Sequence, residues 1–366
     1  MVKITRFKGI RPEKKYINKV PTKAYSEYSK NELAFELQSN PYSFLNILKN
    51  KKTNKNFNNV KKNIDNFLKR KILVQDEKKS IYIYIQEKQT SIFIGLICGI
   101  SLQDYGNNNI KIHEKTIKKR ELLFAKYLAE VQMYAEPVLV THENNQVDTL
   151  LNDCIQDINH KIYDFNDLDN INHQLWEVPV KYQDDIIHLF SDVNNLYIAD
   201  GHHRLSSSFI NNKHTHCLAY IVSKSQLKTL PFHRVITHQN NTTNILKKIT
   251  SQLSVSKVDK LNHNMLNMYI NQQWYEITFE KQHTNKSIND DLLVNKLSKY
   301  ILKPIFGIQN ERADKLVSFI PGNKPINQLI QNLDCMQVLF LLPPIGINTI
   351  IKISKKNKIM PPKSTF

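Results

Sequence analysis

Hairpin patterns lie among helical patterns along this chain, and that mixture limits the folds it can adopt. Apolar and polar residues alternate strictly over 80–86, and 91–100 is more uniformly apolar. The residues between them predict a turn, so the two segments are expected to form an antiparallel hairpin. A second hairpin is expected from 265–270 and 274–279. Because helical patterns separate the hairpins, we predict a mixed α+β fold.

The other periodic segments complete this expectation. Helical spacing of apolar residues predicts helices over 30–38, 56–70, 114–131, 147–158 and 182–190, and another just after Gly201. Strands are expected over 4–12, 137–141, 196–199 and 217–222. With 366 residues, the chain is long enough for two domains. No Ser/Gly linker marks a boundary, so we place a soft one near 239–242, giving a core over 1–240 and a C-terminal α+β region over 241–366 packed on it.

The composition is that of an ordinary folded protein with excess positive charge. Hydrophobic residues make up 41% and charged residues 23%, which excludes disorder as an overall description. The net charge is +18, yet only seven of the 51 basic residues are arginine. Two interpretations stay open: lysines on solvated faces, or attraction to nucleic acid or anionic nucleotides. Scarce arginine argues against specific base reading, in which arginine contacts dominate.

The expected location of the protein and the state of its cysteines are inferred from targeting and cysteine motifs that the sequence lacks. The longest purely apolar run, 92–100, is too short for a membrane helix, which needs about 20 residues, so no membrane association is expected. The N-terminal segment does not resemble a secretory signal, and the cytoplasm is the expected location. The four cysteines form no CxxC motif. Cys98 and Cys217 lie in strand-like runs and are expected to be buried thiols.

The densest group of reactive side chains is the segment Asp200-Gly201-His202-His203-Arg204. An apolar strand runs into it and a helical pattern follows. Gly201 permits a tight turn, and a helix that begins there directs backbone N–H groups toward one point. Imidazole and guanidinium groups add donors for phosphate oxygens. Asp200 is suited to binding Mg²⁺ or to accepting a proton. The alternative is a polar helix cap with exposed histidines.

Other candidate sites carry weaker signals. His214 and His216 would share one strand face, but no third zinc ligand is evident, so exposed histidines are favoured over a zinc site. His113-Glu114-Lys115 opens an expected helix, and Arg234 follows His233; each alone is typical of a surface. The chain contains no P-loop, Rossmann, GxSxG or HExxH motif.

Taken together, the motifs resemble an uncharacterised prokaryotic family called domain of unknown function ten-fifteen, whose signature is ADGHHR. The matching blocks, in order, are KGIRP at 8–12, NPYSFL at 40–45, IHEKT at 112–116, LW at 175–176, YIADGHHR at 197–204, LPFHRV at 230–235, GI at 307–308 and MPPKSTF at 360–366. The chain departs from the family near 21–26, where a Pro-Pro-Tyr-Asp-like segment is usual, and it ends sooner after the MPPKST block.

The DGHHR segment is also similar to the phosphate-binding elements of the ParB/sulfiredoxin superfamily, which includes nucleotide hydrolases and a free-serine kinase. This resemblance implies a ParB/sulfiredoxin-like core. It also implies a nucleotide-dependent phosphotransferase or nucleotide hydrolase, with a small hydroxyl compound as acceptor in the kinase case. ATP or another nucleotide and Mg²⁺ are the implied cofactors.

In this interpretation Asp200, His202, His203 and Arg204 are catalytic, and Asp200 also binds the metal. The expected nucleotide contacts are Gly201, His113, Glu114, Lys115, Arg234, Lys363 and Ser364. Two alternatives stay open: a binding protein or scaffold for an anionic metabolite without turnover, and a ParB-like, nucleotide-switched protein on DNA. No helix-turn-helix module supports the second. The sequence does not identify the substrate or the oligomeric state.

Overall fold

The computed structural model of the chain describes residues 1–48, 57–158, 160–238, 242–280 and 287–363. It is a mixed α+β protein, as expected. Its contacts divide it into a first unit, Met1–Lys111 with Thr116–Leu227, and a second unit, Ile112–Lys115 with Lys228–Phe366. The sequence boundary was placed near 240, and it assigned 112–115 to the core. The chain therefore passes from one unit to the other at 111–112, 115–116 and 227–228, where the composition shows no linker.

The first unit is built on a nine-stranded mixed sheet, with the strand order β6-β10-β7-β11-β5-β4-β9-β8 and β1 paired to β5. Its strands are β1 (Ile4–Thr5), β4 (Tyr82–Lys88), β5 (Ser91–Ser101), β6 (Ile110–Lys111), β7 (Val138–His142), β8 (Tyr163–Asn166), β9 (Asn172–Glu177), β10 (Leu196–Asp200) and β11 (His216–Ser223). The β6–β10 and β7–β11 pairs are parallel. The hairpin expected over 80–100 is confirmed as β4–β5.

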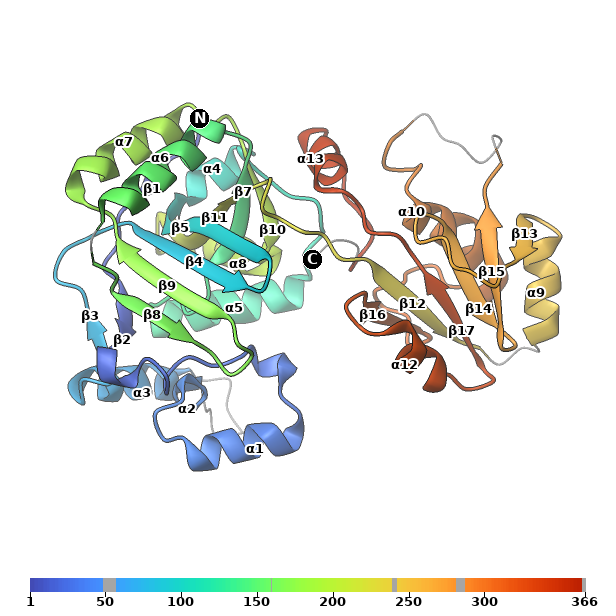
Figure 1. Cartoon of the computed structure of the whole chain (residues 1–366), viewed down its shortest axis with the longest axis horizontal. Helices are drawn as coiled ribbons and strands as arrows, with labels where there is room; N and C mark the ends of the chain where they lie inside the picture. The colour runs from blue at the N-terminus through green and yellow to red at the C-terminus, as the bar shows by residue number, and fades with distance from the viewer. Residues whose placement is uncertain (49–56, 159, 239–241, 281–286, 364–366) are drawn as a thin grey trace. The chain divides into compact units, whose positions relative to one another are not determined.

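Helices surround this sheet, and a small two-stranded sheet, β2 (Ile10–Pro12) with β3 (Leu73–Gln75), adjoins it. The helices are α1 (Lys30–Ser39), α2 (Phe44–Leu48), α3 (Asn58–Lys69), α4 (Leu102–Gly106), α5 (Lys118–Val131), α6 (Asn145–Asp157), α7 (Val180–Ser191) and α8 (His202–Asn211). In Figure 1, α5 and α8 lie behind the strands of the sheet, and they pack against each other. This pairing positions the start of α8, which carries the DGHHR segment.

The second unit is built on a six-stranded antiparallel sheet, with the order β13-β15-β14-β17-β12-β16. Its elements are β12 (Phe232–Thr237), α9 (Thr242–Thr250), β13 (Ser254–Lys257), β14 (Leu266–Ile270), β15 (Gln273–Thr278), α10 (Leu293–Leu297), a π-helical turn (Ser298–Leu302), α11 (Lys303–Phe306), β16 (Val317–Pro321), α12 (Ile326–Gln331), β17 (Gln337–Leu341) and α13 (Ile347–Lys355). Alternation along β12 sends Ile236 into a core with α9 and α10, and Val235 into a core with α12. Helices therefore cover both faces.

The second expected hairpin is confirmed as β14–β15, with a shorter turn than the sequence indicated. Only Asn271 and Gln272 connect the strands, and both have positive φ, 52° and 59°. Two consecutive left-handed residues are the geometry of a type I′ turn, whose twist matches that of the flanking strands. Asparagine tolerates this conformation, so Asn271 suits the first position of the turn.

Three expectations were wrong at their edges. The helix expected over 114–131 begins only at Lys118; Glu114 and Lys115 belong to the second unit, and Thr116 and Ile117 precede the first turn. The strand expected over 4–12 is two strands with different partners, β1 on β5 and β2 on β3. His214 lies outside β11, which begins at His216, so the two histidines do not share a strand face.

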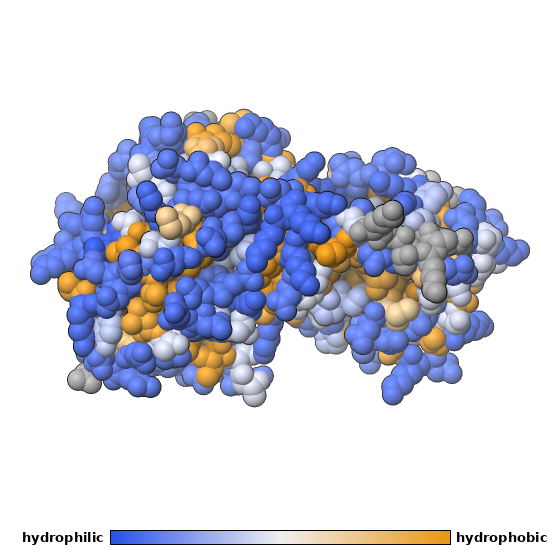
Figure 2. Space-filling view, turned by 90° about the horizontal axis from the view of Figure 1, so that it is seen from above, coloured by the Kyte–Doolittle hydropathy of each residue, from blue (hydrophilic) through white to orange (hydrophobic). Residues whose placement is uncertain are grey.

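The surface agrees with the composition. The face shown in Figure 2 is mostly hydrophilic, with apolar residues scattered over it.

Cys98 and Cys217 are buried, as expected, because they lie on strands within the core of the first unit. Among the described residues, no helix is both long and apolar enough to cross a membrane. The basic helix expected over 56–70 is α3, whose apolar residues face inward; residues 49–56 lie outside the described part of the chain.

Candidate functional site

The DGHHR segment forms the turn where β10 runs into α8. Gly201 has a φ of 97°, a left-handed conformation that L side chains rarely adopt. A Cβ at this position would also lie 2.9 Å from Nε of Arg204, so the guanidinium is packed directly against the glycine. Gly201 is therefore required twice, once for its backbone conformation and once for the space that it leaves. The helix that follows begins at His202.

Two carboxylates hold Arg204 at this turn. Nη2 lies 2.5 Å from Oδ2 of Asp200, and Nη1 lies 2.6 Å from Oε2 of Glu136. The Arg204 side chain is 19% exposed, whereas those of Asp200 and Glu136 are 65% and 64% exposed. Ion pairs with such exposed carboxylates contribute little stability, so a ligand anion or a cation can compete for either partner. Glu136 precedes β7 as an isolated acid, and no motif marked it.

The two histidines differ in their surroundings. His202 is buried, and Nδ1 of His203 accepts a hydrogen bond from the backbone N–H of Ile117 at 3.4 Å. Adjacent helical residues point about 100° apart, so two such side chains do not converge on one atom. Ile117 directly precedes α5, so the start of α5 helps to fix His203.

A buried carboxylate lies where α5 meets α8. Glu121 accepts hydrogen bonds from the hydroxyls of Thr116, at 2.5 Å, and Ser206. Nζ of Lys118 lies 3.8 Å from its other carboxylate oxygen. Sequence reasoning missed Glu121 because it stands in a charged helical stretch, where an acid is expected to be solvated. Its burial follows only from the packing of α5 on α8.

The other candidate residues belong to the second unit. The backbone N–H of Met360 donates to the carbonyl of His113 at 2.7 Å. The guanidinium of Arg312 donates to Glu114 at 2.6 Å and to the carbonyl of Lys115 at 2.5 Å. Arg312 was not predicted, and its place in a loop gave no periodic signal. Together these bonds anchor the short segment 112–115 within the second unit.

Arg234 joins this cluster from β12 and is fully buried. Its Nε donates to Glu311 at 3.0 Å, and that carboxylate is only 5% exposed. Its remaining nitrogens donate to the carbonyls of Phe232, Pro362 and Lys363, at 2.8, 3.0 and 3.1 Å. The carbonyls of Pro362 and Lys363 thus hold the MPPKST segment against β12 within the second unit. Ser364 lies outside the described residues.

The histidine beside Arg234 is held neutral by its surroundings. Burial, together with the positive charge of Arg234 and the nearby His263, lowers the pKa of His233 to about 4. Its Nδ1 accepts a hydrogen bond from the backbone N–H of Leu342 at 3.2 Å. Lys363 extends its Nζ over the ring of Phe232, 5.8 Å from the centroid. The cluster therefore has the bonding pattern of a structural anchor.

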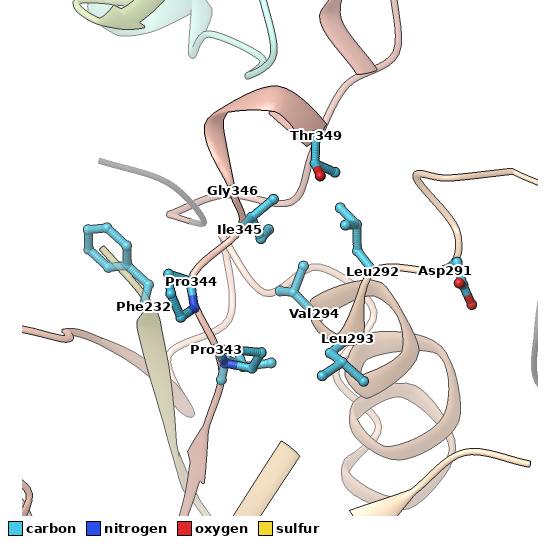
Figure 3. Close-up of a pocket in the computed structure, with 11 residues that line it drawn as sticks. Phe232, Asp291, Leu292, Leu293, Val294, Pro343, Pro344, Ile345, Gly346 and Thr349 are labelled. Carbon is cyan, nitrogen blue, oxygen red and sulfur yellow. The ribbon is translucent and has the colours of Figure 1, made fainter. Parts of the chain in front are cut away.

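An apolar pocket of about 240 Å³ lies in the second unit (Figure 3). Its walls are Leu292 and Val294 on one side and the Pro343-to-Gly346 stretch on the other, with Thr349 at the rim. None of the candidate site residues lines it. The pocket is too small and too apolar for a nucleotide.

Metal binding has a limited set of donors. Among the described residues, no group of three or more His, Cys, Asp or Glu side chains is arranged to hold a metal ion. Magnesium in nucleotide sites needs only one or two carboxylates, because phosphate and water supply the other oxygens. Asp200 and Glu136 fit that smaller requirement.

Comparison with solved structures finds only loose similarity. A mutant of free serine kinase in complex with ADP is 11% identical, with a TM-score of 0.41 over 77% of this chain and 89% of that chain. SbnI with a C-terminal truncation, from Staphylococcus aureus, is 11% identical, with a TM-score of 0.42 over 74% of this chain and 81% of that chain. A conserved hypothetical protein from Pyrococcus furiosus is 10% identical, with a TM-score of 0.37 over 76% and 91%.

At these TM-scores the likeness is too loose to assign an activity, and the relation to the ParB/sulfiredoxin superfamily stays a prediction. No curated protein matches the chain in sequence. The family expectation is confirmed, because a family model matches residues 4–300, most of the chain. The chain therefore belongs to the family described as protein of unknown function, DUF1015.

Proposed function

We propose that this protein is a nucleotide-dependent phosphotransferase that binds nucleotide phosphate at the turn between β10 and α8. A small compound with a hydroxyl group is the proposed acceptor. One observation carries the proposal: the guanidinium of Arg204 packs against Gly201 at the first turn of α8. A fixed positive charge and a helix N-terminus thus share one location on the surface.

The turn supplies several hydrogen-bond donors that suit a phosphate group. Gly201 has no side chain with which to cap the helix, and the first turn of any helix presents N–H groups without partners inside the helix. These groups and the helix dipole attract phosphate. Arg204 adds two or more charge-assisted hydrogen bonds. His203 stands in the same first turn, and we assign it to the same ligand.

Magnesium is expected to assist. In the free protein Arg204 is balanced by two carboxylates, so the local charge is negative and a bare anion is repelled. Mg²⁺ held by Asp200 and Glu136 would neutralise charge on the transferred phosphoryl group. The carboxylates would then exchange Arg204 for the metal, and the guanidinium would be available to phosphate. Nucleotide binding should therefore depend on Mg²⁺.

The proposal rests on the residues of the DGHHR turn and Glu136. Nucleotide contact by His113, Glu114, Lys115, Lys363 or Ser364 stays a prediction. Arg234 donates to Glu311 and to three backbone carbonyls, and we assign it an anchoring role. The cytoplasmic location also stays a prediction.

Thermal unfolding with ATP, ADP, CTP and GTP, with and without Mg²⁺, tests the proposal. A ligand that binds only the native state adds about 2.7 kcal/mol at 100 times its Kd. We expect one nucleotide to raise the midpoint in the wild type with Mg²⁺, and Arg204→Ala to abolish the rise. Arg6→Ala is the matched control, because Arg6 also pairs with an exposed carboxylate, Asp184 at 2.6 Å, away from the turn.

Turnover then separates the remaining alternatives. Incubation with the stabilising nucleotide and a set of small hydroxyl compounds should yield nucleoside diphosphate and a phosphorylated compound. Diphosphate with inorganic phosphate alone would indicate a hydrolase. Binding without product would indicate a protein that holds an anionic ligand. An equal midpoint shift in wild type and Arg204→Ala would overturn the placement of the phosphate site.

A further inference from the structure

The apolar pocket of the second unit is bounded by three separate parts of the chain. Phe232 comes from the start of β12, Leu292 and Val294 from the start of α10, and the Pro343-to-Gly346 stretch from the connection between β17 and α13. All of these residues belong to the second unit, so one unit alone forms the pocket. Val294 and Phe232 are themselves buried, at 5% and 8% exposure. The pocket is therefore a hollow within the packed part of this unit.

The walls of the pocket are held apart in the protein without a ligand. Pro343 and Pro344 have a φ fixed by their rings, and they have no N–H that a ligand or water could use. Ile345, which follows them, packs with Leu292 against the buried face of α13. Both sides of the pocket are therefore anchored to the core, and the hollow exists before anything binds in it.

Water is a poor occupant of such a pocket. The volume of about 240 Å³ admits several water molecules. A well-held buried water needs two to four polar partners, and these mostly aliphatic and prolyl walls supply few. Displacing poorly held water by an apolar group is favourable. The pocket therefore favours a ligand that is mainly apolar.

The volume limits the size of this ligand. An engineered apolar cavity of about 150 Å³ in another protein binds benzene. At about 240 Å³, the pocket is large enough for one such ring with a short substituent. Prolyl rings and the ring of Phe232 offer flat surfaces that suit the faces of a planar ring.

The rim of the pocket sets the charge and the polar end of the ligand. Asp291 lies at the rim, but its Oδ1 is paired with Nζ of Lys296 at 2.5 Å, and in Figure 3 its carboxylate points away from the other side chains. Of the described residues that line the pocket, none is basic, so a neutral ligand fits best. The Thr349 hydroxyl is directed toward the gap between Ile345 and Leu292 in Figure 3. A hydroxyl can donate or accept, so it suits one polar group of the ligand.

We propose that this pocket binds a small neutral compound with a single ring and one hydroxyl group. The ring lies between Leu292 and the two prolines, and the hydroxyl group lies at Thr349. This is a second ligand site, in the other unit from the phosphate site proposed above. It does not depend on that proposal, and no step of phosphoryl transfer uses it.

Titration of the full chain with 4-methylphenol, followed by NMR of labelled methyl groups, tests the site. We expect saturable shifts at Leu292, Val294 and Ile345. Leu293 lines the pocket and is half-buried, so Leu293→Phe should fill the hollow and abolish these shifts. Leu316→Phe is the matched control, because Leu316 is an exposed leucine of the same unit outside the pocket. Shifts that do not saturate in the wild type, or that persist in Leu293→Phe, would overturn the proposal.

Two further comparisons test the chemistry of the ligand. Thr349→Val keeps the shape of the side chain and removes the hydroxyl, so it should weaken 4-methylphenol by about three- to tenfold. Binding of toluene, the same ring without a hydroxyl, should not change. Equal binding of 4-methylphenol in wild type and Thr349→Val would overturn the assigned polar end.

The amide of N-acetyltyrosine separates a free compound from a protein side chain, because it carries the same ring on a peptide unit. The pocket has no room for the peptide groups, so we expect binding at least about tenfold weaker than that of 4-methylphenol. Binding as tight as that of 4-methylphenol would identify a tyrosine side chain of a partner protein as the occupant, and it would overturn the assignment to a small compound.

Discussion

Two arginines, each directly after a histidine, differ in their burial and in the groups with which they pair. Arg204, in the first unit, is 19% exposed and pairs with two carboxylates that are both about two-thirds exposed. Arg234, in the second unit, is fully buried and pairs with a buried carboxylate and three backbone carbonyls. Arg204 can exchange its partners with a ligand, whereas Arg234 cannot without unfolding its surroundings. A His-Arg pair in the sequence thus predicts no role until burial is known.

Removing the buried arginine should have the largest effect on stability. Arg234→Ala leaves Glu311 as an unpaired buried charge and releases the carbonyls of Pro362 and Lys363. We expect a loss of about 3–5 kcal/mol in the free energy of unfolding, measured by urea denaturation. The double variant Arg234→Met with Glu311→Leu should recover much of that loss. A loss under about 1 kcal/mol in Arg234→Ala would contradict the anchoring role of Arg234.

The neutral histidine beside Arg234 should make stability depend on pH. The pKa of His233 is about 4 in the folded protein, against about 6.5 when unfolded. The unfolded state therefore binds the extra proton first, and stability is full above pH 6.5 and falls as pH drops toward 4, by up to about 3 kcal/mol. His233→Asn keeps an acceptor for the N–H of Leu342 without titrating. Denaturation at pH 7 and pH 5 should show a shallower loss in that variant; identical slopes would contradict the assignment.

Substitution of Gly201 should lower stability because of its backbone conformation and its close contact with Arg204. Gly201→Ala places a side chain at a φ of 97° and within 2.9 Å of Nε of Arg204. We expect a loss of about 1–2 kcal/mol and a displaced guanidinium. Gly346→Ala is the matched control, because that glycine has a φ of −59° and open space around it. The control should be close to neutral, because alanine fits this φ and reduces the freedom of the unfolded chain but caps α13 less well than glycine.

Removing Arg204, whose partners are exposed, should barely change stability. Arg204→Ala breaks ion pairs with exposed carboxylates, which contribute about 0–1 kcal/mol. Urea denaturation should show that small change, while nucleotide binding is lost. A loss of stability as large as that of Arg234→Ala would erase the contrast between the two arginines, and it would favour a structural role for the DGHHR turn.

Local patterns predicted much of the secondary structure and the centre of the candidate site. The β4–β5 and β14–β15 hairpins, α3, and the strand–glycine–helix order around Gly201 all follow from periodicity and turn residues. The β8–β9 hairpin was not predicted, because polar residues such as Asn172 and Gln174 obscure its alternation. Glu121, Glu136 and Glu311 were missed as partners, because each contacts a residue from a distant segment of the chain.

The sequence by itself determined the fold class, the family and the Asp200-to-Arg204 turn, because strand and helix periods and a glycine at a helix start are local properties. Only the tertiary structure decided which charges are buried. It placed residues 112–115 in the second unit, paired Arg234 with Glu311, and set Glu121 beneath α8. Those outcomes depend on contacts between residues far apart in the chain, and burial turns the same side-chain chemistry into an anchor or a binding group.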